Sequence, residues 1–162
     1  MTAAAEQDPR PSRTSPAPAA TPGPTAFALG RAGLVPFVAG ALALWFADPA
    51  SQATLAFALS AYAATIVAFL GGIHWGLGAR AAVNGSARLV WGVVPSLVAW
   101  AALLLPPSAG LVVHGAALAT CYAVDRRVFP VEGLAAWLPL RLQLTTIAAA
   151  SCAASAGALL WR

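Results

Sequence analysis

A single histidine stands among four glycines in the stretch L-G-G-I-H-W-G-L-G, which runs from Leu70 to Gly78. Imidazole is the side chain that changes charge near neutral pH, and an ionisable group inside an apolar helix is a candidate functional residue. Two interpretations of His74 stay open. A neutral ring could bond a neighbouring hydroxyl or carbonyl and hold two helices together, or it could line a cytoplasmic vestibule on a solute path. We favour the first, because no acidic partner is visible within the apolar segments.

The glycines near His74 belong to a longer row of small residues. A small side chain recurs every fourth position, at Ser60, Ala64, Ala68, Gly72 and Gly76. Membrane helices pack through such faces, because small side chains let two backbones approach closely. We therefore expect this face to pack against another helix, most tightly at Gly72 and Gly76.

The acidic residues and the second histidine suggest no catalytic or metal centre. Asp48, Asp125 and Glu132 all fall at the predicted ends of apolar segments, and His114 is expected in the opposite leaflet from His74. We find no nucleophile–base set, phosphate loop or metal-ligand spacing, so the sequence predicts a protein that is not an enzyme and has no cofactor or metal.

The motif Asp125-Arg126-Arg127 closes the fourth apolar segment. Asp125 could pair with Arg141 or Arg88 across the end of the bundle. Alternatively, the three charges could act only as a topology signal.

The composition points to a lipid environment. The chain has 162 residues, of which 60% are hydrophobic and only 9% are charged, whereas soluble domains carry roughly 25% charged residues. All nine basic residues are arginine, and they lie between apolar segments rather than in a cluster. This distribution argues against nucleic acid as a partner and for the lipid bilayer.

Five apolar segments are long enough to cross a bilayer as helices, which takes about 20 residues each. They cover residues 27–47, 52–79, 87–105, 108–124 and 140–161. We therefore predict an all-α bundle of five transmembrane helices over 27–162. Residues 1–26 are rich in Pro and Ala and should form a disordered cytoplasmic tail. A mitochondrial targeting segment and a cleaved signal peptide ending after the first apolar segment are the alternatives.

The arginines predict the orientation. With the N-terminus inside, eight of the nine arginines lie on the cytoplasmic side and only Arg162 lies outside, so we expect an N-in, C-out topology. The six tryptophans also fall near predicted membrane boundaries, where indole rings prefer to lie. We expect the cell inner (plasma) membrane, with the mitochondrial inner membrane as the alternative.

Two apolar segments carry unusual residues. Pro95 interrupts the third segment and should bend its helix, with Ser96 available to bond a freed carbonyl. The last segment reads A-A-A-S-C-A-A-S-A-G-A from Ala148 to Ala158. Such a helix should pack centrally, with its hydroxyls free for interhelical hydrogen bonds or, alternatively, with a small-solute path along it. Cys121 and Cys152 are expected to be buried and unpaired.

Several motifs resemble those of one membrane family, domain of unknown function 3429, which includes transmembrane protein 69-like proteins. They are L-G-R-A-G-L-V-P-F, F-L-G-G-I-H-W-G-L, W-G-V-V-P-S-L-V-A-W, D-R-R and L-R-L-Q-L-T, within residues 27–150. The resemblance implies a small multi-span protein without an established biochemical activity. It also implies that eight residues matter to the family: Gly71, Gly72, His74, Trp75, Gly76, Pro95, Arg141 and Thr145.

Together these observations favour a structural or interaction protein, a helix bundle that associates with itself or with other membrane proteins through small-residue faces. The alternative is a permease or channel subunit for a small solute, with His74 in a cytoplasmic vestibule.

Overall fold

The computed structural model describes residues 20–81 and 85–161, and within these ranges the chain is helical with no strand. The helices are α1 (Pro24–Ala32), α2 (Val35–Phe46), α3 (Pro49–Arg80), α4 (Gly85–Leu103), α5 (Pro107–Val128), the short 3-10 helix η1 (Ala135–Trp137) and α6 (Leu138–Leu160). Five helical stretches are long and apolar enough to span a bilayer, with α1 and α2 together forming the first. The predicted all-α bundle of five spans is confirmed.

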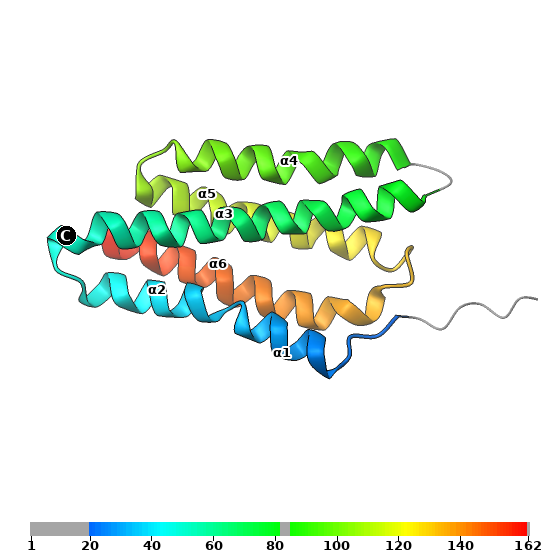
Figure 1. Cartoon of the computed structure of the whole chain (residues 1–162), viewed down its shortest axis with the longest axis horizontal. Helices are drawn as coiled ribbons and strands as arrows, with labels where there is room; N and C mark the ends of the chain where they lie inside the picture. The colour runs from blue at the N-terminus through cyan, green and yellow to red at the C-terminus, as the bar shows by residue number, and fades with distance from the viewer. Residues whose placement is uncertain (1–19, 82–84, 162) are drawn as a thin grey trace, which may run out of the picture.

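The spans lie side by side along the long axis of the molecule (Figure 1). The 32-residue α3 is the longest helix and packs chiefly against α4, while α5 packs against α6. α2 contacts both α3 and α6. The apolar core lies where α2, α3, α5 and α6 meet, around Phe37, Leu44, Val67, Leu111 and Leu118.

The first span is broken, although the sequence predicts one continuous helix over 27–47. α1 ends at Ala32 and α2 begins at Val35, with Pro36 in its first turn. Proline has no N–H and its ring crowds the carbonyl four residues earlier, which kinks or breaks a helix, and here α1 ends at that earlier residue, Ala32. The helix also starts at Pro24, inside the predicted tail. The rest of that predicted disorder, residues 1–19, lies outside the described residues.

The connection between α2 and α3 is capped as its sequence suggests. The carboxylate of Asp48 accepts hydrogen bonds from the Ser51 backbone N–H at 3.0 Å and from the Ser51 hydroxyl at 2.8 Å. These bonds favour the charged form and lower the pKa of Asp48 below its usual value. The cap satisfies a backbone donor at the start of the longest span.

The closest helix contact joins α3 and α4 through glycines other than the expected pair. A Cβ at Gly71 would collide with the carbonyl oxygen of Gly92, and one at Gly78 would lie 3.0 Å from the carbonyl oxygen of Gly85. The helix that the sequence predicts to pack against Gly72 and Gly76 is not one of the helices described in this chain. Both are exposed, with no heavy atom within 4 Å of a Cβ built on them.

The outward position of Gly72 and Gly76 has a geometric cause. A row of residues spaced by four advances about 40° around the helix at each step, because each residue turns by roughly 100°. The row therefore begins in the core at Ser60 and Ala64, becomes half-buried at Ala68 and reaches the lipid-facing side at Gly72.

Pro95 lies inside α4, which continues past it to Leu103. The Pro95 ring is buried beside Gly71, 3.3 Å from a Cβ built there, so it belongs to the α3–α4 contact. The Ser96 hydroxyl donates to the carbonyl of Val93 at 2.7 Å. It does not bond the carbonyl of Trp91, four residues before Pro95, which the proline leaves without its usual helical partner.

The small-residue helix α6 packs centrally, as predicted, with Ala148, Ser151, Cys152 and Ser155 buried. Its hydroxyls do not bond across helices, however. Ser151 donates to the carbonyl of Ile147 and Ser155 to that of Ser151, each within α6. Cys121 and Cys152 are buried and free, as expected.

The two adjacent glycines Gly71 and Gly72 give a matched test of this packing. We expect Gly71→Ala to destabilise the bundle by about 1–3 kcal/mol, since the added methyl group forces α3 and α4 apart. Gly72→Ala should leave stability unchanged or slightly higher, because that position is open and alanine favours a helix. Unfolding of the purified variants in mixed micelles measures both, and equal effects would contradict the assignment of the contact.

Candidate functional site

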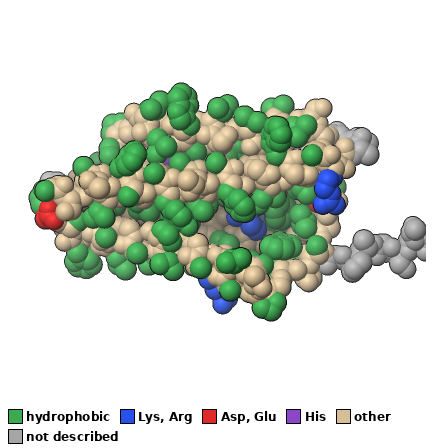
Figure 2. All heavy atoms as spheres, viewed as in Figure 1, with side chains coloured by type: hydrophobic (Ala, Val, Ile, Leu, Met, Phe, Trp, Pro, Cys, Tyr) green, Lys and Arg blue, Asp and Glu red, His purple; other side chains and the backbone are tan. Residues whose placement is uncertain are grey.

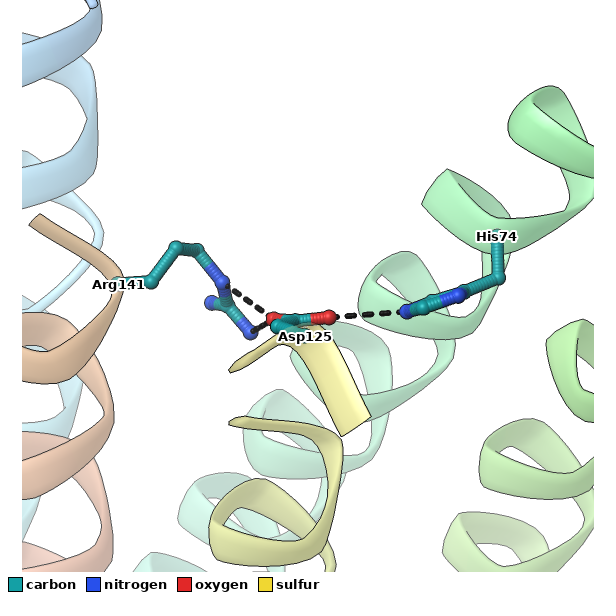
Figure 3. A network of polar contacts seen from close by, with 3 residues as sticks. All are labelled: His74, Asp125 and Arg141. Atoms are coloured by element: carbon teal, nitrogen blue, oxygen red, sulfur yellow. Dashed lines mark hydrogen bonds and ion pairs between the residues drawn. The ribbon is translucent and has the colours of Figure 1, made fainter. Parts of the chain in front are cut away.

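Three charged or ionisable side chains from three different spans meet inside the bundle (Figure 3). His74 lies on α3, Asp125 on α5 and Arg141 on α6. Oδ1 of Asp125 lies 2.9 Å from Nε2 of His74. Oδ2 of Asp125 accepts from Nε of Arg141 at 2.8 Å and from its Nη2 at 2.6 Å. The carboxylate thus ties α3 and α6 to α5.

The cluster is shielded from the surroundings. The exposed fraction is 1% for Asp125, 2% for His74 and 8% for Arg141. The rings of Trp91 and Phe129 each lie 6.4 Å, centre to centre, from the imidazole. In such an environment a charge is tolerated only when it is paired and hydrogen-bonded, and Asp125 and Arg141 satisfy that condition for each other.

The hydrogen-bond pattern assigns the proton on the imidazole. Carboxylate oxygens only accept, so Nε2 of His74 carries the hydrogen and donates it to Asp125. Nδ1 of His74 is buried and has no hydrogen-bond partner. Arginine remains charged throughout, so the cluster consists of an anion, a cation and a polar ring that donates to the anion.

The expectation that no acid partners His74 is wrong. The predicted fourth span ended at residue 124, but α5 continues to Val128 and carries Asp125 into the bundle. The periodicity of α5 contained the signal: buried residues recur every three or four positions along one face. They are Leu111, His114, Leu118, Cys121 and Asp125. A carboxylate that continues an apolar face in register lies inside, whereas Arg126 and Arg127 are exposed.

One of the two alternatives for Asp125 is confirmed. Asp125 pairs with Arg141, as the sequence allowed, and this also places Arg141 inside the bundle rather than at its rim. Arg88 instead forms an ion pair with Glu132, 2.6 Å from Nη2 to Oε1, at a more exposed position.

The other predicted candidates are distributed around this cluster. Thr145 lies one turn beyond Arg141 on α6 and is buried, with no partner for its hydroxyl. Trp75, next to His74 in sequence, is half exposed on the outer surface, on the same helix as the exposed Gly72 and Gly76. The structure therefore brings together His74, Asp125 and Arg141, leaves Gly72 and Gly76 facing outward, and lays the half-exposed ring of Trp75 against Gly92 of α4.

The second histidine forms a separate contact. His114 on α5 is fully buried, and its Nδ1 lies 3.4 Å from the hydroxyl of Ser60 on α3. Across residues 20–81 and 85–161, no three His, Cys, Asp or Glu side chains gather as a metal site would require. His114 thus fastens α3 to α5 at a second point.

The described structure does not place His74 in a vestibule, as the permease alternative would require, because the side chain is buried. An apolar cavity does adjoin the cluster, but Arg141 and Thr145 line it and His74 does not. The imidazole is enclosed between α3, α4 and α5.

The family described as "Protein of unknown function (DUF3429)" matches residues 22–157. The chain belongs to the DUF3429 family. It is also 36% identical over 137 residues to "Transmembrane protein 69" of Xenopus tropicalis, a match that covers 78% of this chain and 51% of that relative. No solved structure matches it.

The name of the frog relative agrees with the five long apolar helices in describing a multi-pass membrane protein. The matched range contains the whole Asp–Arg–His cluster and the α3–α4 glycine contact. The chain spans about half the length of the frog relative, so comparison extends to the bundle and not to that whole protein.

Removing one member of the cluster should cost far more than breaking the outer ion pair. We expect Asp125→Asn to lower the free energy of unfolding by about 3–5 kcal/mol, since it leaves the Arg141 charge buried without a counter-charge. Glu132→Gln, which breaks the pair with Arg88, should cost at most about 1 kcal/mol.

The double variant Asp125→Leu/Arg141→Leu provides the control for charge. It should be more stable than Asp125→Leu alone, because no unpaired charge remains. Unfolding in mixed micelles measures all four variants. Equal losses for Asp125→Asn and Glu132→Gln would show that the buried cluster is not a stabilising pair.

Proposed function

We propose that this membrane protein is a structural and interaction bundle that forms a dimer with a second copy through the outward face of α3. The observation that carries the proposal is the exposure of Gly72 and Gly76, which have open space where a side chain would begin. Association of helices through small-residue faces needs such a surface.

The exposed glycines have no function within the chain's own packing. Gly71 and Gly78 make the close contact with α4, whereas a Cβ built on Gly72 or Gly76 would meet no heavy atom within 4 Å. In a helix, glycine costs up to about 1 kcal/mol relative to alanine. Close packing of another helix backbone against a lipid-facing pair of glycines spaced by four would offset this cost.

A second copy is the partner that suits this face best. The exposed residues on α3 closest to the two glycines are Thr65, Phe69 and Trp75, which are uncharged, and the charged Arg80 lies one turn beyond Gly76 at the end of the helix. A two-fold axis along the membrane normal places like residues opposite each other and keeps both copies in one orientation. From Thr65 to Gly76 the two faces carry no charge, so they fit together in this way without any opposite charge on the partner.

The Asp–Arg–His cluster supports the same role. A helix bundle that presents a binding face needs that face held in a fixed position, and the carboxylate of Asp125 joins α3 to α5 and α6. Burial of His74 against Asp125 favours the fastening interpretation over the permease alternative, in which a histidine would line a solute path.

We further propose the plasma (inner) membrane, with the arginine-rich end of the bundle in the cytoplasm. Arg80, Arg88, Arg126 and Arg127 lie at or near the ends of α3, α4 and α5 that meet at one end of the molecule. The excess of arginine in cytoplasmic loops supports this orientation.

The test compares two pairs of exposed small residues. Gly72→Leu/Gly76→Leu should weaken dimer formation at least tenfold, because bulky side chains hold the α3 backbones apart. The matched control, Ala153→Leu/Gly157→Leu, alters an equally exposed small pair on α6 and should leave dimerisation unchanged. Energy transfer between labelled copies in liposomes measures the dimer fraction.

Two outcomes would overturn the proposal. One is a wild-type protein that stays monomeric at every protein-to-lipid ratio. The other is a dimer that withstands the α3 changes but not the α6 changes. Thermal unfolding of each variant separates loss of association from loss of the fold.

A further inference from the structure

A cavity of about 500 Å³ opens beside the charged cluster, between α1–α2, α3 and α6. Figure 2 shows it as a hollow below α3, with basic side-chain atoms at its base. Ligand pockets in proteins occupy roughly 300–1,000 Å³. The hollow therefore has the size of a small-molecule site, and it lies on the side of a membrane bundle.

The wall of the cavity is almost entirely apolar. Leu29, Phe37, Phe69, Ile73 and Leu144 contribute from four helices. Such a surface suits a hydrocarbon chain, which the surrounding lipid can supply.

Two polar side chains interrupt the apolar wall, and both come from α6. They are Arg141 and Thr145, one helical turn apart. Both are more than nine-tenths buried. Polar groups placed at one end of an apolar pocket usually determine how a ligand is oriented.

Each of these side chains retains hydrogen-bonding capacity. The Thr145 hydroxyl has no partner, whereas the hydroxyls of Ser151 and Ser155 further along α6 bond carbonyls of the same helix. Threonine in a helix adopts two side-chain rotamers, so its hydroxyl can turn toward the cavity. Arg141 binds Asp125 through Nε and Nη2, and its remaining nitrogen, Nη1, points away from Asp125 (Figure 3).

The charges of the cluster restrict the charge that the head group of a ligand can carry. Asp125 already neutralises Arg141, so an anionic head would add an uncompensated negative charge beside a buried carboxylate. A cationic head would be repelled by the guanidinium. An uncharged head group can accept hydrogen bonds from Nη1 of Arg141 and from the Thr145 hydroxyl. It adds no unpaired negative charge, and the guanidinium does not repel it.

We propose that this cavity binds an amphiphile with an apolar chain and an uncharged carbonyl head. The chain lies against the apolar wall, and the carbonyl oxygen accepts hydrogen bonds from Arg141 and Thr145. Two classes of membrane molecule combine an apolar chain with an uncharged carbonyl group, namely acylglycerol lipids and quinones. The proposal does not rest on dimerisation through α3, although Phe69 belongs both to that face and to the cavity wall.

The test measures saturable binding of three radiolabelled probes to the full-length protein in detergent. The probes are a monoacylglycerol, a short-chain benzoquinone and a long-chain fatty acid, the last ionised at the pH of the assay. At least one of the two uncharged probes should bind at one per chain, and the fatty acid should bind at least tenfold more weakly. Binding of the monoacylglycerol alone assigns the lipid source, and binding of the quinone alone assigns the quinone.

Matched variants locate the bound probe. Thr145→Val removes the hydroxyl at nearly constant shape and should weaken binding about fivefold, the loss expected for one neutral hydrogen bond. Thr120→Val, at an exposed threonine that bonds its own helix, should have no effect. Ala26→Trp fills the cavity and should weaken binding at least tenfold, whereas Ala28→Trp on the exposed side of α1 should not.

Three results would overturn the proposal. They are the absence of saturable binding by both uncharged probes, tightest binding by the fatty acid anion, and full binding by both Thr145→Val and Ala26→Trp. Thermal unfolding confirms that each variant is folded before its binding is interpreted.

Discussion

A carboxylate buried in a membrane bundle needs a cation and hydrogen-bond donors to stabilise its charge. In this protein Asp125 of α5 takes them from two other helices, α3 and α6. Its two oxygens are used in full, one by His74 and the other by Arg141. Because the alternative is an unpaired charge in a medium of low dielectric, the register of α3 and α6 against α5 is determined to within the reach of these bonds. Apolar packing alone specifies register less sharply, since hydrocarbon surfaces can slide over one another.

The glycines of α3 fall into two groups that lie on different surfaces of the helix. Gly71 and Gly78 bring the α4 backbone close, and this contact places Pro95 beside Gly71 and Trp91 beside His74. Gly72 and Gly76, one and two residues away in sequence, face the lipid. A single helix thus has one small-residue surface inside the bundle and another outside it, and the charged cluster holds the helix in the rotation that separates them.

The sequence was sufficient for the fold class, the five spans and most of their limits, because length and continuous hydrophobicity decide them. It also allowed the pair between Asp125 and Arg141, since both were expected at one end of the bundle. It did not reveal the pair between His74 and Asp125. The arginines after Asp125 suggested the end of a helix, whereas one more turn of α5 places the carboxylate inside. The rotation of α3 was missed for a related reason, since spacing by four looks like a straight face in sequence but winds around the helix.

Asp125 and Arg141 are only 16 residues apart and stand on consecutive spans. Inserting an aspartate at the centre of a transmembrane helix is unfavourable by about 2.5–3.5 kcal/mol, and an arginine carries a similar penalty. In a helical hairpin made of α5 and α6, each charge meets its counter-ion during the same insertion event. The order of the helices along the chain therefore lets the two buried charges enter the membrane as a neutral pair, after α3, which carries His74, has been made.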